Sequence, residues 1–251
     1  MCGIAGLFRQ DGLAREDEGA VRRMIAALHH RGPDSGGLWL DGRAGIALGH
    51  RRLAILDISD NGAQPMASVG GRYVITFNGE IYNWASLKRR LESDGARFRG
   101  HSDTEVMLAA FDRWGVVESL SHLAGMFAFA LWDRHDRSLF LARDRLGEKP
   151  LYLAEIDGAT VFASELHAFR AHPQWQGRVD ESAAHSFLAT GWVPAPATIY
   201  SEFLRLRRPA GSGFAKARRP VMAATGHLPI LPERLRKPGV KQKRFTSLRP
   251  R

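Results

Sequence analysis

Residues 1–8 read MCGIAGLF, and this short stretch indicates both a strand and a reactive group. Ile4 to Phe8 form an apolar run, which is typical of a buried strand. Cys2 is the only cysteine in the chain, so it cannot form an internal disulfide. A lone cysteine is more often an inert apolar residue than a nucleophile. Removal of Met1, however, would make Cys2 the first residue and place a free α-amine beside its own thiol.

An N-terminal cysteine combines two of the groups that acyl transfer requires. The thiolate is the attacking species, and an α-amine with an unperturbed pKa of about 7.7–8.0 exchanges protons near neutral pH. Such a site needs no separate catalytic histidine. If Met1 stays in place, the nitrogen belongs to a peptide bond and the base is lost. The residues alone therefore make Cys2 a candidate nucleophile that depends on the loss of Met1, beside the alternative of an inert apolar residue.

The following residues form clusters of predicted strands and clusters of predicted helices. The apolar patterns predict strands at 4–8, 45–48, 53–58, 73–77, 126–132, 138–142, 151–154 and 160–163, and helices within 21–28, 83–95, 102–114, 165–171 and 181–189. Residues 30–34 read as a turn-rich loop, and Ser102 to Glu105 as a capping box. Because regular βαβ alternation is missing, the order favours an α+β fold with mostly antiparallel sheets.

The composition is that of an ordinary globular protein, with 251 residues, 44% hydrophobic and 25% charged. The sequence contains no run of about 18 apolar residues, so it predicts no membrane span, and the N-terminus lacks the pattern of a secretory signal. A single cysteine agrees with a reducing compartment. We therefore expect a soluble, cytoplasmic protein.

The net charge of +10 belongs to the C-terminal segment. Residues 201–251 contain 14 Lys and Arg against two acidic residues, whereas residues 1–200 contain 22 basic and 24 acidic residues. Six of the 12 prolines also lie in the basic segment. We expect a folded body at 1–200 and a disordered basic tail at 201–251.

Several polar residues in the body have the chemistry of a binding site. Asn78 and Gly79 follow a predicted strand and offer an amide NH₂ and a backbone N–H, the donor pair of an oxyanion hole, although an Asn-Gly pair by itself is usually a turn. Arg52 can hold a carboxylate through paired hydrogen bonds, and Glu80 or Asp103 can receive an ammonium group. Each charge taken alone is more often a solvated surface group.

Nine motifs in one order make the pattern specific. They are MCGIAG (1–6), HRGPDSGG (30–37), GHRRLAILD (49–57), GAQPM (62–66), FNGEIYN (77–83), HSDTEV (101–106), LAGMFAFALWD (123–133), ARDRLGEKPLY (142–152) and FASEL (162–166). Together they closely resemble the N-terminal glutaminase domain of glutamine-hydrolysing asparagine synthetase, a class II glutamine amidotransferase. Glucosamine-phosphate synthase and amidophosphoribosyltransferase share the N-terminal cysteine, but GEKPLY and NGEIYN favour the asparagine synthetase branch.

The resemblance implies an N-terminal-nucleophile hydrolase fold, an αββα sandwich with two mostly antiparallel sheets between helical layers. It implies that Cys2 is the nucleophile, with its α-amine as the base, and that Asn78 and the Gly79 N–H form the oxyanion hole. The implied contacts of the substrate glutamine are Arg52 for the α-carboxylate, Glu80 and Asp103 for the α-ammonium, and the backbone near Ile55 as part of the wall.

The implied glutaminase step uses no cofactor and no metal. In the family, a second domain binds ATP and Mg²⁺ to activate aspartate, receives the ammonia and contains an SGGxDS loop. Here Ser35-Gly36-Gly37 continues as Leu38-Trp39 inside the first domain, so it is not that loop. We therefore expect the synthetase domain to be absent from this chain, and a separately supplied synthetase domain or subunit to be the partner.

The resemblance ends after LATGWVPAPATIY (188–200), and the switch to Arg, Pro and Ala is what a frameshift in a GC-rich gene would produce. A genuine nucleic-acid-binding arm is the rival interpretation, but Phe245 is the only aromatic residue after Phe214, which leaves little for base stacking. Two functions remain open: a glutaminase that supplies ammonia for asparagine synthesis, and an inactive or regulatory remnant that binds glutamine.

Overall fold

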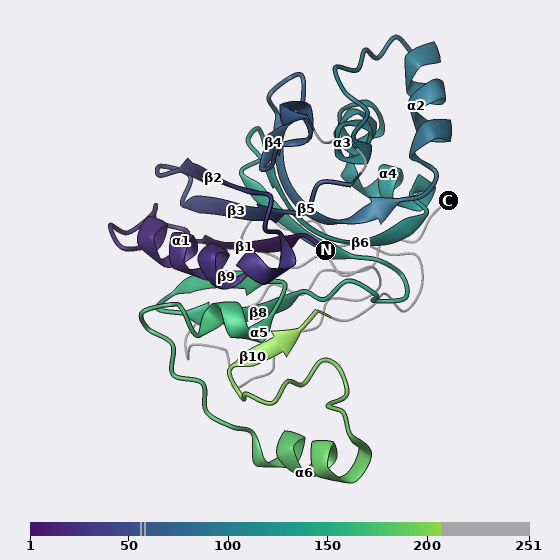
Figure 1. Ribbon diagram of the computed structural model, residues 1–251. Coiled ribbons are helices and arrows are strands. Elements are labelled where there is room, and N and C mark those ends of the chain that lie inside the picture. The colour runs from purple at the N-terminus through teal and green to yellow at the C-terminus, as the bar shows by residue number, and fades with distance from the viewer. Residues whose placement is uncertain (56, 58, 207–251) are drawn as a thin grey trace, which may run out of the picture.

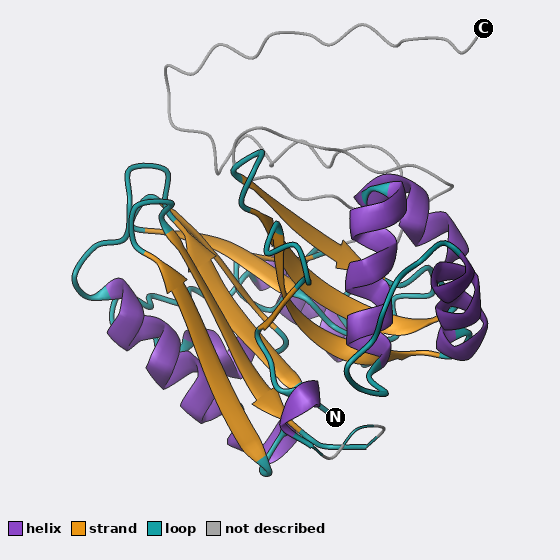
Figure 2. Ribbon diagram, turned by 90° about the horizontal axis from the view of Figure 1, so that it is seen from above, coloured by secondary structure: helices purple, strands orange, loops and turns teal. Residues whose placement is uncertain are grey.

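The computed structural model describes residues 1–55, 57 and 59–206, which form a sandwich of two β-sheets between helices (Figure 1, Figure 2). The first sheet has six strands in the spatial order β10 (Phe203–Arg205), β8 (Tyr152–Ile156), β9 (Ala159–Ala163), β1 (Gly3–Phe8), β3 (Ile46–Arg52) and β2 (Ser35–Asp41). The second has four, in the order β4 (Met66–Ala67), β5 (Tyr73–Ile81), β6 (Gly125–Asp133) and β7 (Ser138–Arg143). All pairings between these strands are antiparallel, which confirms the predicted α+β sandwich.

Helices cover the outer face of each sheet (Figure 2). The six-stranded sheet is covered by α1 (Asp17–Ala27) and α5 (Leu166–Phe169). The four-stranded sheet is covered by α2 (Trp84–Ser93), α3 (Asp103–Trp114) and α4 (Val116–His122). Outside these layers lie α6 (Glu181–Thr190) and two 3₁₀ turns, η1 (His29–Arg31) and η2 (Asp60–Gly62). None of the helices in the described part of the chain is long and apolar enough to cross a membrane.

The centre of the molecule is an apolar layer between the two sheets. Because successive side chains of a strand point to opposite faces, β1 contributes Ile4 and Phe8 to this layer. Trp132 of β6 is 1% exposed, and its ring centroid lies 5.6 Å from that of Phe8. Gly6 of β1 has no room for a side chain, because a methyl group there would collide with the ring of Phe162. Close packing therefore fixes β1, and with it the residues that precede the strand.

Two hydrogen bonds join β3 of the first sheet to β5 of the second. Thr76 donates from Oγ1 to the carbonyl of Gly49 at 3.0 Å, and His50 Nε2 lies 3.0 Å from the carbonyl oxygen of Phe77. Burial lowers the pKa of His50 to about 4, so the ring is neutral and donates from Nε2. Since β1 pairs with β3, these contacts bring the start of the chain close to the middle of β5.

The structure corrects the strand predicted at residues 53–58. Strand β3 ends at Arg52, and Leu53 to Ile55 form a loop, while residues 56 and 58 lie outside the described residues. The physical reason is that both neighbours of β3 stop at this point. Arg51 is opposite Gly3, the first residue of β1, and Arg52 is opposite Ser35, the first residue of β2. A longer β3 would therefore have no backbone to pair with.

Among the strands and α-helices of the described residues, the sequence patterns do not predict β2, β4, α4 and β10. The sequence of β2 begins with Ser-Gly-Gly directly after the turn-rich loop predicted at 30–34, yet β2 pairs along its whole length with β3. The predicted capping box of α3 is only partly present. Ser102 accepts from the amide of Thr104 at 3.2 Å, whereas Glu105 accepts from the amides of Arg99 and Gly100.

The sheet continues past the boundary that we expected at residue 200. Strand β10 pairs with β8, and the ring centroid of Phe203 lies 4.9 Å from that of Phe169 and 4.8 Å from that of Trp175. Arg143 donates to the carbonyl of Leu206 at 2.7 Å. The folded region therefore includes residues 201–206. The rest of the predicted basic tail, residues 207–251, lies outside the described residues.

Candidate active site

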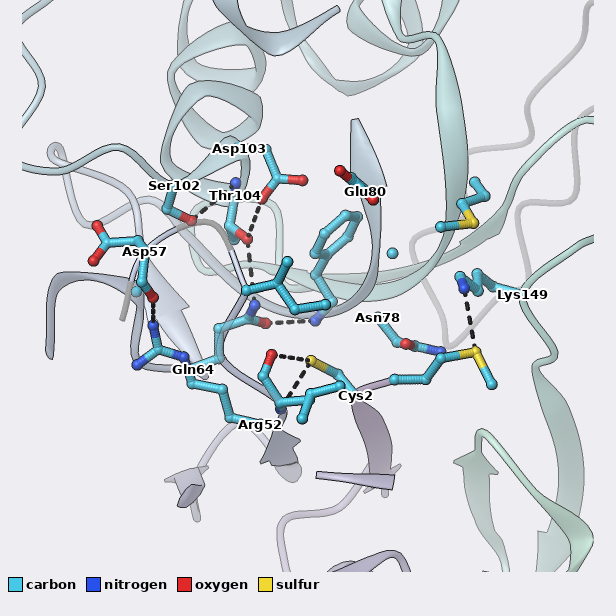
Figure 3. A pocket seen from close by; sticks show the side chains of 17 residues that line it. Cys2, Arg52, Asp57, Gln64, Asn78, Glu80, Ser102, Asp103, Thr104 and Lys149 are labelled. Carbon is cyan, nitrogen blue, oxygen red and sulfur yellow. Dashed lines mark hydrogen bonds between the residues drawn. The ribbon is translucent and has the colours of Figure 1, made fainter. Parts of the chain in front are cut away.

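A pocket of about 120 Å³ is lined by all six residues that the resemblance implied (Figure 3). It lies where the start of the chain, the end of β3, the middle of β5 and the first turn of α3 meet. The six residues are Cys2 before β1, Arg52 at the end of β3, Asn78, Gly79 and Glu80 in β5, and Asp103 at the start of α3. Ile55 also lines the pocket. Segments that are far apart in the sequence thus line one pocket.

The thiol of Cys2 is half-buried against the loop that follows β3. Its sulfur lies 3.5 Å from the amide nitrogen of Leu53 and 3.7 Å from the carbonyl oxygen of the same residue. Burial raises the pKa of the Cys2 thiol, and this effect exceeds the opposing influence of the Leu53 hydrogen bond, the positive N-terminus and Arg52. The resting thiol therefore keeps its proton and needs a base before it can attack.

Met1 anchors the start of the chain inside the same pocket. Its sulfur accepts from Lys149 Nζ at 3.3 Å (Figure 3). It also accepts from Arg31 Nη2 at 3.8 Å. Arg31 also donates from Nε to the carbonyl of Cys2 at 2.9 Å and from Nη1 to Glu165 at 2.6 Å. The position of Cys2 is thus fixed from the backbone side by a buried guanidinium.

Asn78 and Gly79 present two adjacent donor groups on β5. Asn78 is 1% exposed, and its side-chain nitrogen has no hydrogen-bond partner in the described part of the protein. Gly79 is opposite Phe127, and an added Cβ would come within 2.7 Å of the Phe127 backbone, so only glycine is accommodated. A buried, unpaired amide N–H is costly, which indicates that the Asn78 nitrogen is kept for a ligand.

Arg52 is held by the loop that forms one wall of the pocket. It donates to the carbonyl of Ser59 at 2.9 Å and to the carbonyl of Asp57. The Asp57 carboxylate accepts from the hydroxyl of Ser59 at 2.6 Å and from the amide of His101 at 3.1 Å. These bonds lower the pKa of Asp57 and connect the loop to the segment before α3.

Two carboxylates lie on the opposite side of the pocket from the cysteine loop. Asp103 is buried and accepts from the amide of Ile81 at 2.9 Å. Burial raises the pKa of Asp103, and the nearby charge of Glu80 acts in the same direction. Glu80 is half-buried and makes no hydrogen bond or ion pair within the described residues. An ammonium group placed between the two carboxylates would relieve this repulsion.

Sequence reasoning missed three residues of the site, although each lies in a quoted motif. Gln64 accepts from the amide of Phe77 at 2.7 Å and donates to Thr104 Oγ1 at 3.3 Å, so it connects β5 to the start of α3. Lys149 and Arg31 contact Met1, as described above. No periodicity points to these residues, because each belongs to a loop or turn. Within the described residues, no group of three His, Cys, Asp or Glu side chains is placed to hold a metal ion.

Comparisons with known proteins agree with this arrangement. The family model described as a glutamine amidotransferase domain matches residues 1–219. Asparagine synthetase [glutamine-hydrolyzing] 3 of Bacillus subtilis is 38% identical over 212 residues, covering 84% of this chain and 34% of that protein. Asparagine synthetase [glutamine-hydrolyzing] 1 of the same species is 40% identical over 201 residues, covering 79% and 31%. The chain thus spans about a third of the length of these curated relatives.

The fold has counterparts among solved structures. The glutamine phosphoribosylpyrophosphate amidotransferase of Bacillus subtilis superposes with a TM-score of 0.59 at 24% identity, covering 71% of this chain and 45% of that one. This likeness supports the predicted sandwich of two antiparallel sheets between helical layers. The resemblance to asparagine synthetases that the nine motifs indicated is confirmed by the curated relatives. Because the family model spans residues 1–219, the chain belongs to the glutamine amidotransferase domain family.

Proposed function

We propose that the chain hydrolyses glutamine to glutamate and ammonia, with Cys2 as the nucleophile after Met1 has been removed. The observation that supports this most directly is the convergence of the six predicted residues on one pocket. A thiol, two neutral N–H donors, a guanidinium and two carboxylates complement the side-chain amide and the zwitterionic backbone of glutamine.

In this proposal the charged residues orient the substrate. Arg52 binds the α-carboxylate, and its guanidinium is already held by the backbone carbonyls of Asp57 and Ser59, which lowers the entropic cost of binding. Glu80 and Asp103 receive the α-ammonium. Fixing both ends of the glutamine backbone leaves its side-chain amide directed toward Cys2.

The first half-reaction forms a thioester. The α-amine of Cys2 accepts the thiol proton while the sulfur attacks the amide carbon, and the electron pair of the C=O bond moves to oxygen. Asn78 and the Gly79 N–H donate to this oxyanion. As the oxyanion collapses, the C–N bond breaks and the α-ammonium gives its proton to the leaving nitrogen, which departs as ammonia. Placing the base on the nucleophile's own residue fixes their geometry covalently.

The second half-reaction releases glutamate. A water molecule gives a proton to the α-amine and attacks the thioester carbon, and the same donors hold the second oxyanion. The C–S bond then breaks, and the sulfur regains a proton from the α-ammonium. The balance is glutamine and water converted to glutamate and ammonia, with the enzyme unchanged.

We further propose that the ammonia serves asparagine synthesis, because the relatives at 38% and 40% identity are glutamine-hydrolysing asparagine synthetases. The ATP- and Mg²⁺-dependent activation of aspartate would take place on a synthetase domain or subunit outside the described residues. A cytoplasmic location belongs to the same proposal, since the nucleophile has to remain a reduced thiol.

A second candidate is a remnant or regulatory module that binds glutamine without hydrolysing it. Two observations favour it: with Met1 in place the Cys2 nitrogen is a peptide nitrogen, and the buried thiol has a raised pKa. Such a chain would keep its contacts to the glutamine backbone but lack the base.

Incubation of the purified chain with glutamine separates the two candidates. Glutamate and ammonia release would be measured together with the intact mass, which reports Met1, and Cys2→Ala would serve as the control without a nucleophile. Release that needs Cys2 and accompanies loss of Met1 supports the glutaminase. Binding of glutamine without release supports the second candidate, and absence of binding contradicts both.

A further inference from the structure

Lys149 is an unusual lysine, because it is buried beside the start of the chain. It is 6% exposed, lines the pocket, and its ammonium nitrogen lies 3.3 Å from the sulfur of Met1 (Figure 3). Within the described residues it has no carboxylate partner. A thioether is a weak acceptor for an ammonium group. Burial of a charge with so little compensation is costly, so the position of this lysine requires an explanation beyond packing.

The chain fixes the backbone on both sides of this lysine. Asp144 accepts from the amide of Lys149 at 3.0 Å and from the amide of Phe127 at 3.2 Å, which attaches the loop to β6. Arg143 donates from Nε to the carbonyl of Lys149 at 2.6 Å. With its backbone held in this way, the side chain extends into the pocket toward Met1.

The other charged groups near Cys2 are compensated or lie on other walls. They are Arg31 with Glu165, Arg52, Asp57, Glu80 and Asp103. The Arg31 charge is neutralised by Glu165 at 2.6 Å. Arg52 lowers the pKa of the Cys2 thiol, and Asp103 raises it. Lys149 is thus the cation at the chain start that has neither a carboxylate partner nor a carbonyl acceptor within the described residues.

We propose that, once Met1 is removed, Lys149 acts as a positioning residue whose ammonium group lies against the N-terminal cysteine and favours its neutral α-amine and its thiolate. The inference rests on the proposed function. Removal of Met1 takes away the atom that Lys149 contacts and leaves the α-amine of Cys2 at the vacated end of the chain. A positive charge beside an amine disfavours its protonation, and beside a thiol it favours the thiolate. Both effects prepare the nucleophile and its base together.

The first test is the pH profile of kcat/KM for glutamine hydrolysis. In Lys149→Met, we expect the acid limb to move up by about one pH unit, so that activity falls roughly tenfold at pH 7 and recovers near pH 9. Lys149→Arg keeps the positive charge, so the acid limb of its pH profile is expected to stay at the pH found for the parent chain. Lys88→Met is the matched control, because Lys88 on α2 is the other lysine of the described residues and lies outside the pocket.

The second test needs no turnover. Cys2 is the only cysteine of the chain, so intact mass reports its alkylation by iodoacetamide. In chains that lack Met1, the pH of half-maximal alkylation rate should rise by about one unit in Lys149→Met and stay unchanged in Lys149→Arg. Lys149→Gln provides a second neutral variant if Lys149→Met does not fold.

The two tests distinguish failure of the inference from failure of the proposed function. If the neutral variants lose activity equally at all pH values and alkylation keeps its midpoint, the inference is overturned while the glutaminase stands. If the parent chain releases no ammonia but the alkylation midpoint still shifts, the proposed function fails and the influence of Lys149 on Cys2 stands.

Discussion

Asn78 contributes a buried side-chain nitrogen to the pocket wall and has no partner for it within the described residues. A donor that the folded protein leaves unpaired can act on charge that develops during a reaction. Asn78→Ala should therefore lower kcat by about 10²- to 10³-fold with little change in KM. Asn78→Asp keeps the shape without the N–H donor and is expected to lose as much. A variant that raised KM and left kcat intact would exclude an oxyanion role.

Asp103 illustrates a conflict between binding and stability at the same residue. Asp103→Asn keeps an acceptor for the Ile81 amide but loses the charge that is proposed to receive the α-ammonium of glutamine. KM for glutamine should rise about 10- to 100-fold, the range expected for a hydrogen bond to a charged group. Steady-state kinetics with Ser102→Ala, a neighbouring substitution that keeps the carboxylate, provides the comparison. An unchanged KM would remove Asp103 from substrate binding.

The same substitution has a defined effect on stability. The folded-state pKa of Asp103 is raised above its unfolded value. Its stabilising contribution to the free energy of unfolding is therefore present below the unfolded pKa and is lost as pH rises through the folded pKa. At neutral pH the carboxylate thus opposes folding. Thermal unfolding of Asp103→Asn should occur at or above the parent Tm at pH 7, and the difference should shrink on acidification.

At the scale of elements, the contact between β3 and β5 determines how the two sheets meet, and His50 lies at its centre. Its folded-state pKa of about 4 is below the ordinary value of 6.5. The stabilising contribution is therefore present above the unfolded pKa and is lost as pH falls from 6.5 toward 4, by about 3 kcal/mol. His50→Gln retains an N–H donor for the Phe77 carbonyl but does not titrate. Its unfolding free energy should decline less over this pH range, whereas an identical slope in both proteins would contradict the assignment.

Gln64 aligns β5 with α3 and has no role in the proposed reaction steps. By bonding the Phe77 amide and the Thr104 hydroxyl, it relates the position of β5 to that of α3. The proposed oxyanion donors and the carboxylate proposed to bind the ammonium group lie on these two elements, so their separation depends on this bridge. The backbone carbonyls of Asp57 and Ser59 hold Arg52 in a comparable way.

At the scale of the whole molecule, β10 makes the edge of the first sheet and buries Phe203 against α5. A chain ending at residue 200 loses this strand, whereas a chain ending at residue 206 keeps it. The shorter chain should be less stable by at least the roughly 3–5 kcal/mol that loss of a buried phenylalanine costs. Denaturant unfolding of the two chains provides the measurement, and equal midpoints would show that β10 does not belong to the cooperative unit.

Local patterns identified the central strands and the main helices, because apolar periodicity reports which face of an element is buried. The same patterns gave wrong predictions where pairing with a neighbouring strand determines whether a segment is a strand. Leu53 to Ile55 have the composition of a strand but no neighbouring backbone to pair with, and the glycines of β2 suggested a loop although β3 provides a full ladder. The length of a strand depends on both of the strands that pair, so the composition of one segment does not determine it.

The amino-acid sequence alone specifies the sole cysteine at position 2, the order of the nine motifs and hence the residues expected around glutamine. Only the tertiary structure brought Cys2, Arg52, Asn78 and Asp103 into one pocket and placed Lys149 and Arg31 against the first residue. The reason is that periodicity and motifs describe neighbours along the chain. Contacts between distant loops depend on how two sheets pack face to face, and that packing is decided by the core as a whole.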